Sequence, residues 1–375
     1  MAKLKLGMVG GGQGAFIGGV HRIASRIDDN YELVAGCLAS SPEIAHASAK
    51  ELKISDDRSY ESFEEMADKE SLRDDGINVV AIVTPNHLHY PIADAFLKKD
   101  IHVICDKPLS HNLEDAEKFL QSVKNNNALF ALTHNYTGYP MVRQAREMFR
   151  NGEIGNLRVI QAEYAQDWLT LPIENEGQKQ ASWRTDPSKA GLGGSIGDIG
   201  SHAFNLADFI TGAKLIELCA DISNFVPGRK NDDNAHVLLR YENNIRGMLW
   251  SSQIAVGNEN ALRIRIYGDK GGMEWEQENP NYLTVDIFGE AKKIIRRAGN
   301  ETIDIANRVS RIPPGHPEGY LEGFANIYSD FAQQILTYKE NVKTSEDYML
   351  VPSIEDGVKG VKFITSVVES SSNGG

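Results

Sequence analysis

Polar side chains recur in the middle of the chain where an amphipathic helix could instead carry leucines. In "GLGGSIGDIGSHAFNLADFITG", residues 191–212, a glycine-rich loop enters a helical stretch that places Asp198, His202 and Asn205 on one face. An imidazole, with a pKa near about 6.5, suits proton transfer at neutral pH. The structural alternative makes Asp198 an N-terminal helix carboxylate and His202 a half-buried histidine with satisfied hydrogen bonds.

A lysine forms a second candidate. "CDKPLS", residues 105–110, places Lys107 just beyond the carboxyl end of a short apolar strand, where ligands of open α/β sheets bind. Pro108 stiffens the chain after it, although a surface charge is an equal alternative. No metal is predicted, because a zinc alcohol dehydrogenase site would need thiolates and no cysteine lies near Asp198 or His202 in the sequence.

The N-terminal segment has the pattern of strand, glycine turn and helix. We predict a buried strand over 4–9, a tight turn over 10–15 and an amphipathic helix over 16–27. Gly10, Gly12 and Ala15 match G-x-G-x-x-G/A and enclose Gln13 and Gly14. This pattern predicts a pyrophosphate site at the helix N-terminus, with a glycine-rich turn that binds nothing as the alternative.

The same alternation continues to about residue 133. Apolar runs at 33–39, 79–83, 102–105 and 129–133, with a helical stretch at 91–99, predict a doubly wound parallel sheet. Many such domains bind the ribose 2′-hydroxyl with a carboxylate at the end of the second strand. Ser40 and Ser41 occupy that place, which leaves NADP open; the absence of a nearby cation favours NAD.

Beyond residue 133 the pattern changes. Alternating stretches at 158–164, 235–241, 247–254 and 262–267 predict a large, mostly antiparallel sheet packed on helices. The predicted organisation is therefore α/β, with a dinucleotide-binding Rossmann domain over 1–133 and an α+β domain for substrate binding over 134–375. A helix is expected over 347–369, followed by a frayed polar tail.

Composition narrows the partners. The 375 residues, 41% hydrophobic and 24% charged, carry a formal net charge of −13, which argues against binding to nucleic acid or anionic membranes. Three cysteines (Cys37, Cys105 and Cys219) lack CxxC spacing, so we interpret them as buried small apolar residues in a reducing compartment. With no apolar run of about 20 residues and no signal-peptide pattern, a cytoplasmic location is expected.

Taken together, the motifs carry a resemblance over essentially the whole chain. "VGGGQGA", "VTPNHLHYPIA", "CDKPLS" and "WRTDPSKAGLGGSIGDIGSHAFNLADFITG" occur in this order. The chain resembles the glucose–fructose oxidoreductase, inositol dehydrogenase and rhizopine-catabolism (Gfo/Idh/MocA) family. The resemblance implies a Rossmann domain and an open-faced α/β domain whose sheet builds homodimers or homotetramers.

The resemblance also implies where cofactor and substrate lie. Lys107 would sit beside the nicotinamide, and Asp198 and His202 would face the substrate. The cofactor would be flanked by Thr84, Pro85, Asn86 and His87. The chain departs from the family pattern at three places. Asp106 replaces the usual glutamate before the lysine, where it could still orient Lys107 and hold the ribose side. Asn205 replaces a common aspartate, and the serines at 40 and 41 are the third departure.

The implied activity is an NAD(P)-dependent dehydrogenase that oxidises a ring secondary hydroxyl of an inositol, sugar or sugar derivative. His202 would be the general base, Lys107 would stabilise the alkoxide, and Asp198 would bind a neighbouring hydroxyl. Further substrate contacts are expected from Tyr136, Trp183, Arg184, Asn205 and His316, although the aromatic residues are equally compatible with core packing and His316 with a solvated turn. Two alternatives are an NAD-dependent, glycoside hydrolase-like redox cycle and a catalytically silent nucleotide-binding sensor.

Overall fold

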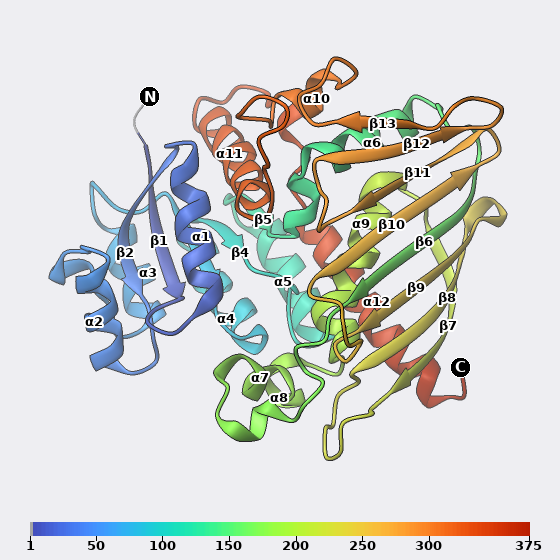
Figure 1. Cartoon of the computed structure of the whole chain (residues 1–375). Helices are drawn as coiled ribbons and strands as arrows, with labels where there is room; N and C mark the ends of the chain where they lie inside the picture. The colour runs from blue at the N-terminus through green and yellow to red at the C-terminus, as the bar shows by residue number, and fades with distance from the viewer. Residues whose placement is uncertain (1–2) are drawn as a thin grey trace. The chain divides into compact units, whose positions relative to one another are not determined.

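The computed structural model describes residues 3–375 (Figure 1). The chain forms two compact units, one built from the residues up to Asn135 together with Leu321–Val358, and the other from Tyr136–Tyr320 and Lys359–Gly375. The first unit is therefore discontinuous in sequence. The change of unit near residue 135 lies close to the domain boundary expected at 133, but residues 321–358 group with the nucleotide-binding half.

The first unit contains a five-stranded parallel sheet. Its strands are β1 (Leu4–Gly10), β2 (Tyr31–Cys37), β3 (Val79–Val83), β4 (His102–Cys105) and β5 (Phe130–Leu132). The strand order is β2-β1-β3-β4-β5, and every neighbouring pair is parallel. The order reverses at β1, which creates a switch point at the carboxyl ends of β1 and β3, the usual ligand site of such sheets. The predicted Rossmann-type sheet is confirmed.

Helices cover this sheet. They are α1 (Phe16–Ile27), α2 (Pro42–Glu51), α3 (Phe63–Ser71), α4 (His89–Leu97), α5 (Leu113–Asn125) and α11 (Tyr320–Lys339). Helix α11 belongs here because its aromatic side chains pack on the N-terminal segment. The Tyr328 ring lies edge-on to Tyr31 at 5.3 Å, and the Tyr31 hydroxyl donates to the Tyr328 carbonyl at 2.8 Å.

The second unit contains an eight-stranded sheet in the order β13-β12-β11-β10-β6-β9-β8-β7. The strands are β6 (Leu157–Ala165), β7 (Leu215–Ser223), β8 (Asn234–Tyr241), β9 (Arg246–Ser252), β10 (Ala261–Gly268), β11 (Gly271–Glu276), β12 (Tyr282–Ile287) and β13 (Lys293–Arg296). The sheet is antiparallel except for the pair β6–β9. The two-residue period is clear in β8, where Val237 and Leu239 are buried and Leu238 is exposed. One face therefore packs on the core.

The helices of this unit are α6 (Pro140–Arg150), α7 (Lys179–Arg184), α8 (Pro187–Ala190), α9 (Ser201–Thr211), α10 (Asp304–Asn307) and most of α12 (Ile354–Ser372). Helices α6 and α9 pack on the sheet (Figure 1). The core between them includes Met141, Phe204, Trp275 and Phe363. The predicted α+β layout, a large open sheet with helices on one face, is confirmed.

Three local expectations need correction. The helix expected from 347 begins at Ile354, because Pro352 lacks the N–H of a helix interior and its carbonyl instead accepts from Leu132. The tail is ordered through Ser372, since the hydroxyls of Ser370 and Ser371 accept hydrogen bonds from β7. Cys37 and Cys105 are buried, but Cys219 is exposed on β7.

The sequence predicted no membrane-spanning segment. None of the helices in residues 3–375 combines the length and the hydropathy that crossing a bilayer requires.

Candidate functional site

The glycine-rich turn joins β1 to α1 with the backbone closely packed. Gly10 and Gly14 have φ of +82° and +75°, which glycine adopts without strain. A Cβ on Gly12 would lie 2.7 Å from both the Leu38 carbonyl oxygen and Ser48 Oγ, whereas the Cβ direction of Gly14 is open. The close helix approach predicted for Ala15 is made in this chain by Gly18, whose Cβ would lie 2.4 Å from the Gly11 Cα.

The N-terminus of α1 differs from those of neighbouring helices. The side chains of Ser41, Ser62 and Asn112 cap α2, α3 and α5, and acidic residues occupy the first turn of each. Helix α1 has neither a side-chain cap at Ala15 nor an acidic first turn. Its N–H groups and positive dipole end are therefore available to an anionic group. Together with the open side of Gly14, this end of the sheet fits a dinucleotide pyrophosphate.

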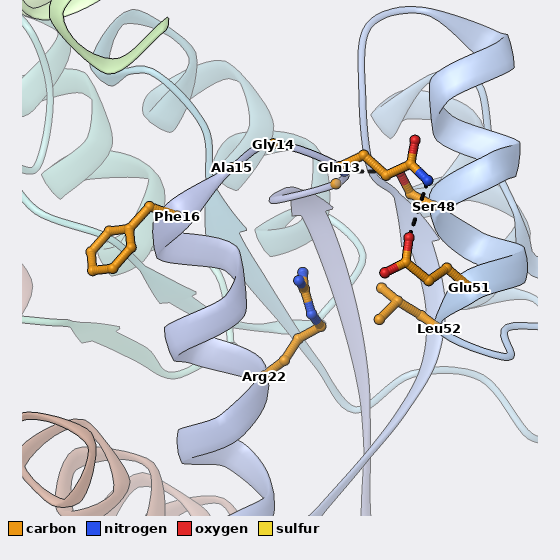
Figure 2. Close-up of a pocket in the computed structure, with 9 residues that line it drawn as sticks. Gln13, Gly14, Ala15, Phe16, Arg22, Ser48, Glu51 and Leu52 are labelled. Carbon is orange, nitrogen blue, oxygen red and sulfur yellow. Dashed lines mark hydrogen bonds between the residues drawn. The ribbon is translucent and has the colours of Figure 1, made fainter. Parts of the chain in front are cut away.

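A pocket of about 360 Å³ lies beside the turn, between α1 and α2 (Figure 2). In Figure 2 the Gln13 side chain turns toward α2, where its amide donates to Glu51 at 3.1 Å; its backbone N–H donates to Ser48 Oγ at 3.0 Å. Both groups thus fasten the turn to α2. A cofactor contact by Gln13 stays a prediction.

The other predicted cofactor residues lie where strands of the same sheet end. Ser40 is exposed between β2 and α2, Thr84 and Pro85 follow β3, and Asp106 and Lys107 follow β4. Asn86 and His87 form a 3-10 turn before α4. The Thr84 hydroxyl is buried and makes no hydrogen bond within the described chain, so a ligand hydroxyl or a water could satisfy it. The first unit therefore gathers all the predicted cofactor residues at one edge.

Asp106 stands in a buried polar network. Thr133 Oγ1 donates to its carboxylate at 2.8 Å, His21 Nε2 lies 3.6 Å away, and the Tyr328 hydroxyl lies 2.9 Å from His21 Nδ1. Burial alone would raise the pKa of Asp106, but contacts with His21 and the charge of Lys107 lower it to about 2. Sequence reasoning missed His21. The sequence feature that could have indicated it is a histidine inside the amphipathic helix predicted over 16–27.

Lys107 also affects a neighbouring histidine. Burial, followed by the positive charge of Lys107, lowers the pKa of His134 to about 3. His134 is therefore neutral across physiological pH.

The second unit holds the predicted substrate residues. Asp198 lies in a π-helical turn, Ile196–Gly200, and His202 and Asn205 lie in the first two turns of α9. The single α-helix expected for all three is thus a π-helical turn continued by an α-helix. Such π-helical turns often occur at functional sites.

Asp198 is held by two neighbours. Arg184 Nε lies 3.2 Å and Gln253 Nε2 2.9 Å from the same carboxylate oxygen. The Arg184 guanidinium stacks over Trp183, 4.3 Å from the ring centroid. Gln253 lies just after β9 and is 2% exposed. Its contact with Asp198 could not be predicted from the sequence, because the two residues are 55 positions apart.

His202 packs against aromatic rings. Its ring centroid lies 4.8 Å from that of Tyr136 and 6.2 Å from that of Tyr164. The two tyrosine hydroxyls are hydrogen bonded to each other, and Tyr164 donates to Asn260 Oδ1 at 2.6 Å. Burial is the main cause that raises the pKa of Tyr136 to about 12, so it stays protonated. Tyr164 lies in β6, where alternation indicated only a core position.

A buried carboxylate fixes the loop before the π-helical turn. Asp232 accepts hydrogen bonds from the Gly194 and Ile196 N–H groups at 2.6 and 2.9 Å and from the Ser195 hydroxyl at 2.7 Å. This interaction sets where the segment carrying Asp198 begins.

The other two predicted substrate residues, Asn205 and His316, differ in their exposure to solvent. Asn205 is buried on α9, while His316 is exposed on a loop. Arg297 donates to the His316 carbonyl at 2.6 Å and pairs with buried Glu318 at 2.6 Å. The His316 backbone is therefore held in place.

Comparisons with known proteins agree with this geometry. A family model described as an oxidoreductase family with an NAD-binding Rossmann fold matches residues 4–148, and a GFO/IDH/MocA C-terminal domain matches residues 142–274. A crystal structure of an oxidoreductase from Sinorhizobium meliloti is 52% identical, with a TM-score of 0.91 over 100% of this chain and 99% of that one.

Two relatives have more specific names. An inositol dehydrogenase homologue from Azotobacter vinelandii, solved with NADH and myo-inositol, is 30% identical, with a TM-score of 0.92 over 100% of this chain and 96% of that one. A levoglucosan dehydrogenase from Pseudarthrobacter phenanthrenivorans is 27% identical over 99% of this chain and 97% of its own length.

The chain belongs to the Gfo/Idh/MocA family of oxidoreductases, with an NAD-binding Rossmann domain at its N-terminus. The family resemblance, the enzyme class and NAD as the cofactor, all expected from the sequence, are confirmed.

Proposed function

We propose that this oxidoreductase oxidises a secondary hydroxyl on the ring of an inositol, a sugar or a sugar derivative. The observation that carries the proposal is a largely buried polar set on neighbouring turns, in which the His202 ring meets Tyr136 and Tyr164 while Arg184 and Gln253 orient Asp198. Polyhydroxylated rings present several donors and acceptors, which such a set can bind. The names of the inositol dehydrogenase homologue and the levoglucosan dehydrogenase support the same class.

The carboxyl ends of the strands in the first unit would hold the cofactor. N–H groups at Gly14 and the start of α1 would bind the pyrophosphate, Ser40 would meet a ribose, and Thr84–His87 with Asp106 would flank the nicotinamide side. Bound NAD supplies the two-electron acceptor for the carbinol carbon.

Side chains of the protein would accept the hydroxyl proton and stabilise the negative charge on the substrate oxygen. His202 takes the hydroxyl proton as general base, and the Lys107 ammonium stabilises the negative charge that develops on the oxygen. Asp198 accepts a hydrogen bond from an adjacent hydroxyl and thereby orients the ring. Because Arg184 and Gln253 hold its carboxylate, Asp198 meets the substrate in one orientation.

The test is absorbance-detected reduction of NAD and, separately, NADP, against a panel of inositols, aldoses and anhydrosugars. We expect turnover with one class of polyol. His202→Ala should lower kcat by about a hundredfold or more, and Lys107→Met should lower kcat far more than the affinity for NADH.

Matched controls exist in each unit. His236→Ala removes an exposed histidine of β8, and Lys98→Met an exposed lysine paired with Asp94; both should keep wild-type turnover. Wild-type kcat in His202→Ala at every pH would contradict the proposed base. NAD that stays bound through purification with no net reduction would instead favour an internal redox cycle.

A further inference from the structure

A second buried histidine joins two segments at the cofactor edge. His89, the first residue of α4, has 0% of its surface exposed. Its Nδ1 lies 2.8 Å from the Pro108 carbonyl oxygen, and its Nε2 lies 2.9 Å from the Thr84 carbonyl oxygen. Both ring nitrogens therefore face backbone acceptors that are 24 residues apart in sequence.

The two segments are those that carry the predicted cofactor contacts. Thr84 opens the stretch that follows β3, and Pro108 directly follows Lys107 after β4. Strands β3 and β4 are hydrogen bonded up to the pair Ile82–Cys105. Asp106 continues this pairing through its N–H to the Ile82 carbonyl at 2.9 Å. Beyond that point, the His89 side chain contacts the backbone of both segments, and the His87 ring lies 6.3 Å from that of His111.

The chemistry of the ring suits this bridge. A neutral imidazole donates one hydrogen bond and a protonated one donates two, so one carbonyl is bound in the neutral form and both in the charged form. The pKa of His89 lies below its ordinary value because burial outweighs the charge of Asp106 and the carbonyls of Thr84 and Pro108, which act to raise it. The neutral ring therefore donates to one of the two carbonyls, and its other nitrogen packs against the second. A glutamine or leucine cannot reproduce two nitrogens on opposite sides of a rigid ring.

We propose that His89 is a positioning residue, which fixes Lys107 relative to the segment 84–87 by joining the Thr84 and Pro108 carbonyls. The bridge itself rests on the contacts of the first unit. Its consequence for turnover rests on the role proposed above for Lys107.

His102 offers a matched control. It is likewise a buried histidine of the first unit, 5% exposed, and its Nδ1 accepts from the Leu129 N–H at 2.9 Å. It begins β4, however, and so lies at the opposite end of that strand from Lys107. His102→Gln therefore removes a comparable buried contact away from the cofactor edge.

The first measurement needs no substrate. Hydrogen–deuterium exchange would be followed by mass spectrometry in the full-length wild type, His89→Gln and His102→Gln. In His89→Gln, peptides covering 84–88 and 106–111 should exchange about tenfold faster while the other strands keep their rates. In His102→Gln those two segments should keep wild-type rates.

The second measurement uses turnover. His89→Gln should lower kcat about tenfold with little change in the KM for the polyol, because the lysine is misplaced and substrate binding is kept. In His89→Ala, added imidazole should restore part of kcat. 1-Methylimidazole, which has no N–H to donate in its neutral form, should restore less.

Each outcome bears on the bridge separately from the proposed function. Unchanged exchange in both segments of His89→Gln, or faster exchange spread over the whole sheet, would overturn the positioning role. Equal rescue by the two imidazoles would also contradict a bridge that depends on an imidazole N–H. If the wild type reduced neither cofactor with any polyol, the proposed function would fail, while the exchange experiment would still decide the bridge.

Discussion

At the scale of single residues, Asp106 shows how one carboxylate can serve both stability and the site. It precedes Lys107, and its mostly buried carboxylate accepts a hydrogen bond from the Thr133 hydroxyl at 2.8 Å and lies 3.6 Å from His21 Nε2. A buried carboxylate is costly without such partners. The network therefore keeps a negative charge beside the proposed catalytic lysine.

The first prediction concerns the negative charge of Asp106. The folded-state pKa of Asp106, about 2, lies below the unfolded value of about 3.9, so the folded protein binds this proton less readily. The carboxylate thus contributes roughly 2 kcal/mol above about pH 4, and this contribution is lost as the pH falls toward 2. Asp106→Asn should lower the free energy of unfolding by that amount at pH 7, measured by urea denaturation.

The pH dependence separates charge from shape. The gap between wild type and Asp106→Asn should narrow as the pH is lowered toward 3. Asp68→Asn, an exposed carboxylate paired with Lys99, should change stability by less than about 0.5 kcal/mol. A gap that stayed constant with pH would mean that the amide disturbs packing and that the carboxylate's charge contributes nothing.

At the scale of elements, the start of α1 depends on glycines that face each other. Gly18 lies on the helix and Gly11 on the turn, and a Cβ on Gly18 would come within 2.4 Å of the Gly11 Cα. The neighbouring Gly19 has only Arg22 Nη2 near its Cβ position, at 3.9 Å. Two adjacent glycines of one helix therefore have different reasons to be glycine.

The second prediction uses this pair. Gly18→Ala should push α1 away from the turn, destabilise the fold by about 1–3 kcal/mol and weaken NADH binding about tenfold or more. Gly19→Ala should instead stabilise by about 0.5–1 kcal/mol, because alanine favours the helix, and keep NADH affinity. Thermal unfolding and NADH fluorescence would measure both, and equal NADH affinities in the two variants would refute the close approach.

At the scale of the whole molecule, the nucleotide-binding unit is completed by residues 321–358, which lie in sequence between the two segments of the second unit. Phe324 and Tyr328 of α11 lie 5.1 and 5.8 Å from His21, between ring centroids, and Tyr328 also contacts Tyr31. Without residues 321–358, these buried surfaces of α1 and β2 would face water.

The third prediction follows from this discontinuity. A fragment ending at residue 135 should not unfold cooperatively, because it lacks the aromatic residues that cover His21 and Tyr31. The same fragment joined by a flexible linker to 321–358 should show a cooperative thermal transition and bind NADH. Circular dichroism would decide, and a cooperative transition in the shorter fragment would show that α11 is dispensable.

Much of the architecture could be predicted because it depends on local patterns. The strands at 79–83 and 102–105 and the helix at 16–27 coincide with β3, β4 and α1, since runs of apolar residues and the glycine turn act over short stretches. The helix predicted from residue 347 begins only at Ile354, because Pro352 precedes it and its carbonyl accepts a hydrogen bond from Leu132 of β5. Alternation indicated that Tyr164 is buried, but could not indicate its contact with His202.

The sequence by itself determined the residue types and their order along the chain: the glycine turn, Lys107 after a strand, and Asp198 and His202 one turn apart. Only the tertiary structure decided the partners of those residues. His21 meets Asp106, His89 spans Thr84 and Pro108, and Gln253 reaches Asp198. Hydrogen bonds and ionic contacts act over about 3–4 Å in space, while the sequence separations they close here range from 5 to 85 residues, so no local pattern can specify them.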